Sequence, residues 1–250
     1  MFTLFETPTW FAGFDLVLDT IALIITLIIS SYSYKLFKLS SNRKFGYFSL
    51  AFALMSLAFL FKLATYTVVY FSTSRALAGA TVVAVTGLTG LETVNVSLRD
   101  LIYRFGFFVQ MASTLGALLL LYLVSQKSRD RLKKFYEVSQ ITLFTYFVIL
   151  ISIVATFKYT VFYLTSFVLL ALIVLNYYQN YLHKKTTNSK RVLTAFICLF
   201  LAQLFFVFIF AANWFYFIAE ILTLASFAII AYVYMQVSRK QKPRSVEVKT

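Results

Sequence analysis

The chain has 250 residues, of which 61% are hydrophobic and only 13% are charged, and its mean hydropathy is +0.83. This composition excludes an ordinary soluble domain and indicates that lipid surrounds most of the chain. The formal net charge of +14 does not indicate nucleic-acid binding, because the cations are spread among short segments between long apolar runs, as they are in membrane proteins.

Apolar runs bounded by charged clusters predict an all-α membrane protein with seven transmembrane helices in one bundle. In chain order the helices are expected near residues 14–37, 46–72, 101–125, 137–156, 158–182, 190–212 and 215–237. The fourth and fifth would form a tight hairpin, because only residues 156–160 join them. Residues 1–237 are thus the predicted transmembrane domain, and residues 238–250 are a basic tail.

The distribution of cations predicts the orientation of the bundle. Most of the 23 Lys and Arg residues fall in four segments, at residues 35–44, 127–134, 184–191 and 239–249. These segments follow the first, third, fifth and seventh helices, so they share one side, and cytoplasmic loops are the ones that keep Lys and Arg. We therefore expect a multi-pass protein of the cell membrane with its N-terminus outside and its tail in the cytoplasm. Membrane lipids with anionic head groups are the expected contacts of the basic segments.

The long connection between the second and third helices, residues 73–100, falls on the outer side in this topology. Residues 81–85 and 94–98 are rich in β-branched side chains and flank two glycines, which predicts a short extracellular β-hairpin. A re-entrant loop is the alternative, because residues 76–91 are apolar and contain three glycines.

Polar side chains at membrane depth are the main candidates for function, because placing them in lipid is costly. Five of them form a candidate ligand-binding or intramembrane polar cluster: Asp19, Lys62, Gln110, Gln203 and Glu220. Lys62 is expected to pair with Asp19 first and Glu220 second, because the first, second and seventh helices are neighbours in a ring of seven. The cluster predicts an outward-facing pocket for an anionic or zwitterionic ligand. The alternatives are a structural lock between helices and a lysine that snorkels to the surface.

Other reactive residues do not form a catalytic site. The only histidine, His183, follows the fifth helix beside two lysines, and the only cysteine, Cys198, lies within an apolar run. No catalytic triad, histidine-based metal site or haem site can be built from them. Asp15 and Arg104 are expected in the head-group layer. The sequence therefore predicts no enzyme, no metal and no cofactor.

Helix breakers are nearly absent from the predicted spans, which hold almost no glycine beyond Gly106 and Gly116. The two prolines, Pro8 and Pro243, lie outside them. Alternating-access carriers usually interrupt helices with Gly or Pro near the bilayer midplane. Continuous helices with many aromatic side chains favour a stable receptor or an assembly subunit over a carrier.

Seven helices with an external N-terminus also occur in microbial rhodopsins and G-protein-coupled receptors, but their functional residues are absent here. The predicted seventh helix contains no lysine for retinal. The stretch Asn42-Arg-Lys-Phe-Gly-Tyr-Phe-Ser-Leu-Ala-Phe52 resembles the start of the second helix in the seven-helix sensor modules that precede histidine kinases in archaea and bacteria. The likeness covers about the first 70 residues. Because no kinase follows the seventh helix, the resemblance implies an output domain on a separate protein.

These observations favour a receptor-like or sensory membrane protein that signals through a separate cytoplasmic partner. A small-solute transporter and an assembly subunit of a membrane complex are the alternatives.

Overall fold

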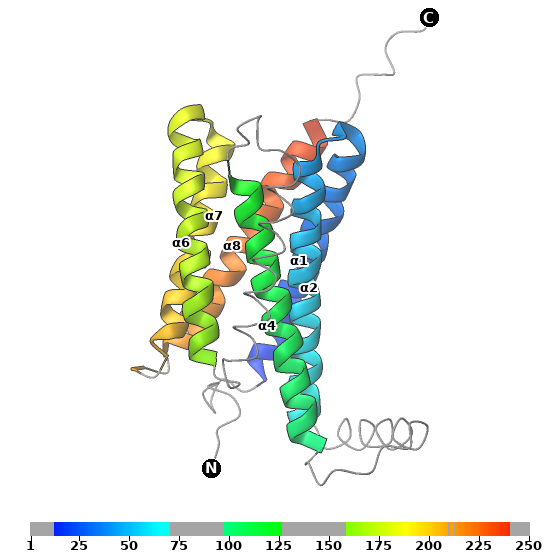
Figure 1. The fold of residues 1–250 in the computed structure, drawn as a ribbon, viewed down its shortest axis with the longest axis vertical. Coiled ribbons are helices and arrows are strands. Elements are labelled where there is room, and N and C mark those ends of the chain that lie inside the picture. The colour runs from blue at the N-terminus through cyan, green and yellow to red at the C-terminus, as the bar shows by residue number, and fades with distance from the viewer. Residues whose placement is uncertain (1–12, 71–97, 127–158, 210, 213, 241–250) are drawn as a thin grey trace, which may run out of the picture.

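Long apolar helices make up the described part of the chain. The computed structural model describes residues 13–70, 98–126, 159–209, 211–212 and 214–240 (Figure 1). Its helices are α1 (Phe14–Ser40), α2 (Arg43–Tyr70), α4 (Leu98–Ser125), α6 (Tyr159–Lys184), α7 (Thr187–Val207) and α8 (Trp214–Lys240). Each of these six is long and apolar enough to cross a bilayer. The chain is therefore a multi-pass helical membrane protein.

Two sequence predictions fall largely outside the described residues. One is the helix near residues 137–156, together with most of its junction to the next helix. The other is the external hairpin within residues 73–100, and no strand occurs in the residues that are described. Leu98, assigned to a strand of that hairpin, instead opens α4. The β-branched residues before it were a weak signal, because strand propensity depends strongly on context.

The end of α7 differs from the prediction. The apolar run at residues 190–212 was expected to be helical throughout, but α7 ends at Val207. The backbone N–H of Ala211 donates to the carbonyl oxygen of Phe208 at 2.9 Å, which closes a tight turn. Ile209 within this turn is buried. The prediction was wrong here because the turn is itself apolar and packed, so hydropathy does not mark the helix end.

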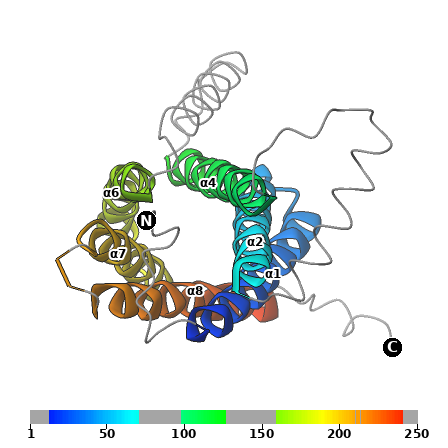
Figure 2. The same cartoon turned by 90° about the horizontal axis from the view of Figure 1, so that it is seen from below.

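The six helices form a closed ring (Figure 2). Around it α1 contacts α2, α2 contacts α4, α4 contacts α6, α6 contacts α7, α7 contacts α8, and α8 returns to α1. Helices α1, α4, α6 and α8 run in one direction, whereas α2 and α7 run in the other (Figure 1). Residues from the beginning, middle and end of the chain therefore face a common centre.

Two short turns join neighbouring helices at one end of the ring. Between α1 and α2, Ser41 adopts a left-handed conformation, and the Asn42 side chain accepts a hydrogen bond from the backbone N–H of Lys44 at 3.1 Å. Between α6 and α7, Lys185 is left-handed and Thr186 caps α7. We call this the basic end, because seven cations with described side chains lie in or near these turns: Lys35, Lys38, Arg43, Lys44, Lys185, Lys190 and Arg191.

Polar and aromatic contacts hold neighbouring helices together. Ser30 on α1 and Ser49 on α2 each donate a hydrogen bond to the other's carbonyl oxygen, at 3.0 and 2.9 Å. Such contacts matter in lipid, where apolar surfaces gain little by leaving one bilayer environment for another. Four stacked ring pairs also join helices. Phe48–Tyr234 joins α2 to α8, and Tyr163–Phe206, Phe167–Phe200 and Tyr177–Phe196 join α6 to α7.

A glycine sets the close approach of α2 and α4. The side chain of Thr65 on α2 occupies the position where a Cβ atom on Gly106 of α4 would lie. Thr65 is itself buried, and its hydroxyl donates to the carbonyl oxygen of Phe61 at 2.8 Å. Small residues let helix backbones approach closely in membranes, and a larger side chain here would push the two helices apart.

We expect Gly106→Ala to lower the stability of the purified protein by about 1–3 kcal/mol, because the added methyl overpacks this contact. Thermal unfolding in detergent would measure the loss. Gly116→Ala is the matched control on the same helix, since its new Cβ would meet Leu54 at an ordinary 3.7 Å. The double variant Gly106→Ala/Thr65→Ala should regain most of the lost stability. A Gly106→Ala variant as stable as Gly116→Ala would contradict this account.

Candidate functional site

Lys62 lies between two carboxylates from different helices. Its ammonium group on α2 donates to Asp19 Oδ1 on α1 at 2.8 Å and to Glu220 Oε1 on α8 at 3.1 Å. The side chains of Asp19 and Glu220 are almost fully buried, and that of Lys62 is 10% exposed. The predicted pairing of Lys62 is confirmed, and both candidate partners are used at once. The alternative in which Lys62 snorkels unpaired to the surface is therefore wrong.

The three groups lie well inside the spans. Asp19 follows the start of α1 by five residues, Glu220 follows the start of α8 by six, and Lys62 precedes the end of α2 by eight. At 1.5 Å per residue the cluster is about 8–12 Å from the helix ends opposite the basic end. Charged groups at this depth need partners from other helices, and the ring brings them together.

One oxygen of the cluster has no hydrogen-bond donor in the described structure. Asp19 Oδ2 is buried and accepts no hydrogen bond there. The ring of Tyr66, one turn from Lys62, lies 5.5 Å from the Lys62 ammonium and adds a cation–π contact. The ammonium charge of Lys62 is therefore well stabilised, and Asp19 Oδ2 can still accept a hydrogen bond.

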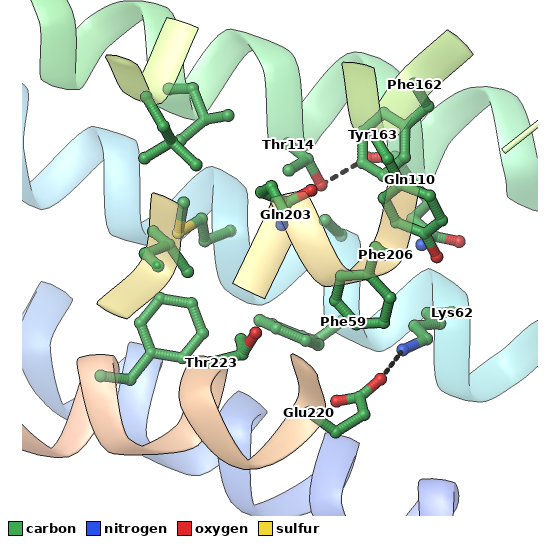
Figure 3. Close-up of a pocket in the computed structure, with 16 residues that line it drawn as sticks. Phe59, Lys62, Gln110, Thr114, Phe162, Tyr163, Gln203, Phe206, Glu220 and Thr223 are labelled. Atoms are coloured by element: carbon green, nitrogen blue, oxygen red, sulfur yellow. Dashed lines mark hydrogen bonds and ion pairs between the residues drawn. The ribbon is translucent and has the colours of Figure 1, made fainter. Parts of the chain in front are cut away.

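A cavity lies beside this cluster at the centre of the ring (Figure 3). The centres of water molecules can occupy about 70 Å³ of it. Since one water molecule needs roughly 10–15 Å³ of such space, several waters or part of a small ligand would fit. Its walls come from α2, α4, α6, α7 and α8.

The cavity has polar side chains among aromatic walls. Its polar lining comprises Lys62, Gln110, Thr114, Tyr163, Gln203, Glu220 and Thr223. Phe59, Phe162, Phe206 and Phe227 supply aromatic surface. Gln203 is more than nine-tenths buried, and its Oε1 accepts no hydrogen bond in the described structure. In Figure 3 one oxygen of Glu220 meets Lys62 and the other turns away from it. Gln203 Oε1 is thus a buried hydrogen-bond acceptor at the cavity wall with no donor among the described residues.

The structure therefore places all five predicted cluster residues at or beside one cavity. Lys62, Gln110, Gln203 and Glu220 line it, and Asp19 stands behind Lys62. Sequence reasoning missed Thr114 and Thr223, as well as the aromatic walls. Helical spacing could have found both threonines, because each follows a predicted site residue by three or four positions and so shares its helix face.

Asp15, expected in the head-group layer, is the second residue of α1, and its side chain is fully buried among protein atoms. Its Oδ1 accepts hydrogen bonds from the backbone N–H groups of Gly13 and Leu16, both at 2.9 Å. A carboxylate in this position satisfies N–H groups that have no partner within the helix and complements the helix dipole. Arg104 near the start of α4 is exposed.

No group of three or more His, Cys, Asp and Glu side chains that could hold a metal ion occurs in the described part of the chain. Comparison with known proteins gives no relative, since no family model, no curated protein and no solved structure matches this chain. The interpretation of the site therefore depends on its geometry.

Removing the charge of Lys62 should be the most damaging single change in the cluster. Lys62→Met leaves two carboxylates buried side by side, and we expect a loss of about 3–5 kcal/mol in thermal unfolding of the purified protein. Asp19→Asn or Glu220→Gln leaves Lys62 paired with one carboxylate, so the pair has no net charge. Each of these variants should lose less stability than Lys62→Met. The triple variant Lys62→Met/Asp19→Asn/Glu220→Gln should be more stable than Lys62→Met alone.

Lys35→Met is the matched control, because this lysine is exposed on α1. Its stability should stay within about 0.5 kcal/mol of the wild type. If Lys62→Met behaved like this control, or if the triple variant were no more stable than Lys62→Met, the ion cluster would not be a coupled unit.

Proposed function

We propose that this chain is a receptor-like or sensory protein of the cell membrane that binds a small ligand in the central cavity and signals through a separate cytoplasmic partner. The observation that carries the proposal is the position of the ion cluster at the wall of the cavity. Ionisable groups at membrane depth mark functional sites by default, and ligand pockets are mostly apolar with a few placed polar groups. The resemblance of the first 70 or so residues to seven-helix sensor modules points the same way.

The charges of the cluster favour a ligand with a cationic group. When all three groups are ionised, one ammonium faces two carboxylates, so one negative charge is left over. Lys62 is held by protein carboxylates, which removes the partner that an anionic ligand was expected to use. Gln203 Oε1 is a further acceptor without a donor. The aromatic walls suit an organic ammonium group, because ring faces attract cations.

The topology behind this proposal is the seven-helix arrangement with an external N-terminus. Helices α4 and α6 run in the same direction (Figure 1). In the proposed topology a seventh span between Ser125 and Tyr159 accounts for this shared direction. The cations at the basic end favour a cytoplasmic location for that end. Both points support seven spans.

A small-solute transporter is the second candidate, because the cavity lies on the axis of the ring, where a carrier would hold its substrate. Receptor function is the better supported of the two. The described helices are continuous, and their positive-φ residues fall only in turns or at the cap of α1. A carrier of the broken-helix type would expose backbone at the midplane.

Reporter fusions test the topology. A reporter joined after Val237 should be active in the cytoplasm, and a reporter inserted at Thr86 should be accessible from outside. The physical reason is the retention of Lys and Arg on the cytoplasmic side. Enzymatic reporters that work on one side of the membrane would measure this. Two reporters on the same side would contradict the seven-helix topology.

Thiol labelling tests the cavity and its charge. In a Cys198→Ala background, a Thr223→Cys variant places a thiol in the cavity wall. We expect external methanethiosulfonate reagents to modify it, with the trimethylammonium reagent reacting about tenfold faster than the sulfonate reagent, because one net charge acts over about 10 Å. Adding Glu220→Gln should bring the two rates together.

Leu172→Cys is the control on the lipid-facing side of α6 and should react slowly with both reagents, since Leu172 is exposed on the outer surface of the bundle. Modification of the Thr223→Cys variant from both sides of the membrane would favour the transporter. No modification from either side would overturn a ligand cavity open to water. Faster reaction with the sulfonate reagent would overturn the cationic ligand.

A further inference from the structure

A second concave surface lies at the basic end, on the outside of the ring. It is an open groove between the start of α7 and the second half of α8. The residues that line it include Thr187, Lys190, Arg191 and Thr194 from α7 and Ala228 and Tyr232 from α8. None of these residues contributes to the central cavity.

The positive charge of this groove is not neutralised by the described part of the protein. Lys190 is exposed at its rim. The guanidinium group of Arg191 donates to Gln236 Oε1 at 3.1 Å and lies 5.3 Å from the ring centre of Tyr232. These contacts fix the position of the guanidinium without cancelling its charge. The ion pairs among the described residues are those of Lys62, near the other end of the bundle.

The start of α7 adds to this positive potential. Thr186 caps the helix by accepting a hydrogen bond from the backbone N–H of Ser189 at 3.3 Å. The helix dipole places partial positive charge at this terminus, where backbone N–H groups are ready to bind an anion. Two cations and a helix terminus thus act on the same small region.

Below the groove the exposed face of α7 becomes apolar. Positions 187, 190, 194, 197 and 201 share one face of α7, since they follow one another by three or four residues. The first three are Thr, Lys and Thr, whereas Ile197 and Leu201 are 37% and 36% exposed. On α8, Ala228 of the groove lining is also exposed. Along this face of α7 the surface is therefore polar and positive at residues 187–194 and hydrocarbon at Ile197 and Leu201.

We propose that this groove binds one anionic phospholipid. The phosphate lies between Lys190, Arg191 and the start of α7, and an acyl chain runs along Ile197 and Leu201. Free phosphate would use only the upper part of the groove, and a neutral lipid would leave the two cations without a counter-charge. Basic pockets between transmembrane helices suit anionic head groups for this reason.

Lipid titration of the purified protein tests this site. In neutral detergent, phosphatidylglycerol should raise the unfolding temperature in a saturable way, whereas phosphatidylcholine should not. Lys190→Gln/Arg191→Gln should weaken the apparent affinity for phosphatidylglycerol about thirtyfold, since each cation near an anionic lipid contributes roughly a factor of five. Ala228→Trp should also weaken binding, because it fills the groove and leaves both cations in place.

The matched control is Arg43→Gln/Lys44→Gln, which removes two exposed cations at the same end, also at the start of a helix. This variant should bind phosphatidylglycerol like the wild type. If Lys190→Gln/Arg191→Gln does not fold, Lys190→Gln alone serves as the test, because this position is exposed and the variant should fold. Its affinity for phosphatidylglycerol should be about fivefold weaker than that of the wild type. If the two double variants lost equal affinity for phosphatidylglycerol, the effect would be non-specific electrostatic attraction, and the proposed site would be overturned. Equal stabilisation by inorganic phosphate or by phosphatidylcholine would also overturn it.

Discussion

The ion cluster of Lys62 is the constraint on which the arrangement of the helices depends. Its ammonium group joins residues that are 43 and 158 positions away in the chain. In lipid, apolar helix surfaces have no strong reason to prefer one another, so a polar contact that must be satisfied selects a particular neighbour and register. By holding α1, α2 and α8 together, the cluster closes the ring. Because burying charges is costly, its main effect is on specificity rather than on total stability.

The closed ring explains why the cavity has its particular chemistry. Large aromatic side chains stack between helices, as Tyr163 and Phe206 do with 4.7 Å between ring centres, and this pair is part of the cavity wall. Lys62 and Glu220, which are joined in the ion cluster, line the same cavity. The polar part of the wall is therefore formed by residues that also lock the helices. A structural lock and a ligand site are not exclusive alternatives here.

Several features of this structure could be predicted from the sequence, and the reasons are physical. A helix must be apolar for about 20 residues to cross the hydrocarbon, so the spans are visible as runs. Charges at that depth are rare and need partners, so Lys62 and its two carboxylates could be found without knowing the fold. The end of α7 could not be predicted from the sequence, because the turn after Val207 is as apolar as the helix. The burial of Asp15 was also missed, since residue type does not reveal a carboxylate that satisfies N–H groups of its own helix.

The cavity and the lipid groove were beyond sequence reasoning for a different reason: each depends on how helices from distant parts of the chain are placed. Helix α8 contributes to both, with Glu220 in the ion cluster and Tyr232 in the groove at the basic end. It is one continuous helix from Trp214 to Lys240, and these two residues are about 18 Å apart along its axis at 1.5 Å per residue. A continuous helix moves largely as a rigid body, so an axial shift at Glu220 would also displace Tyr232. Helix α7 likewise lines both the cavity and the groove, so α7 and α8 each connect the two directly.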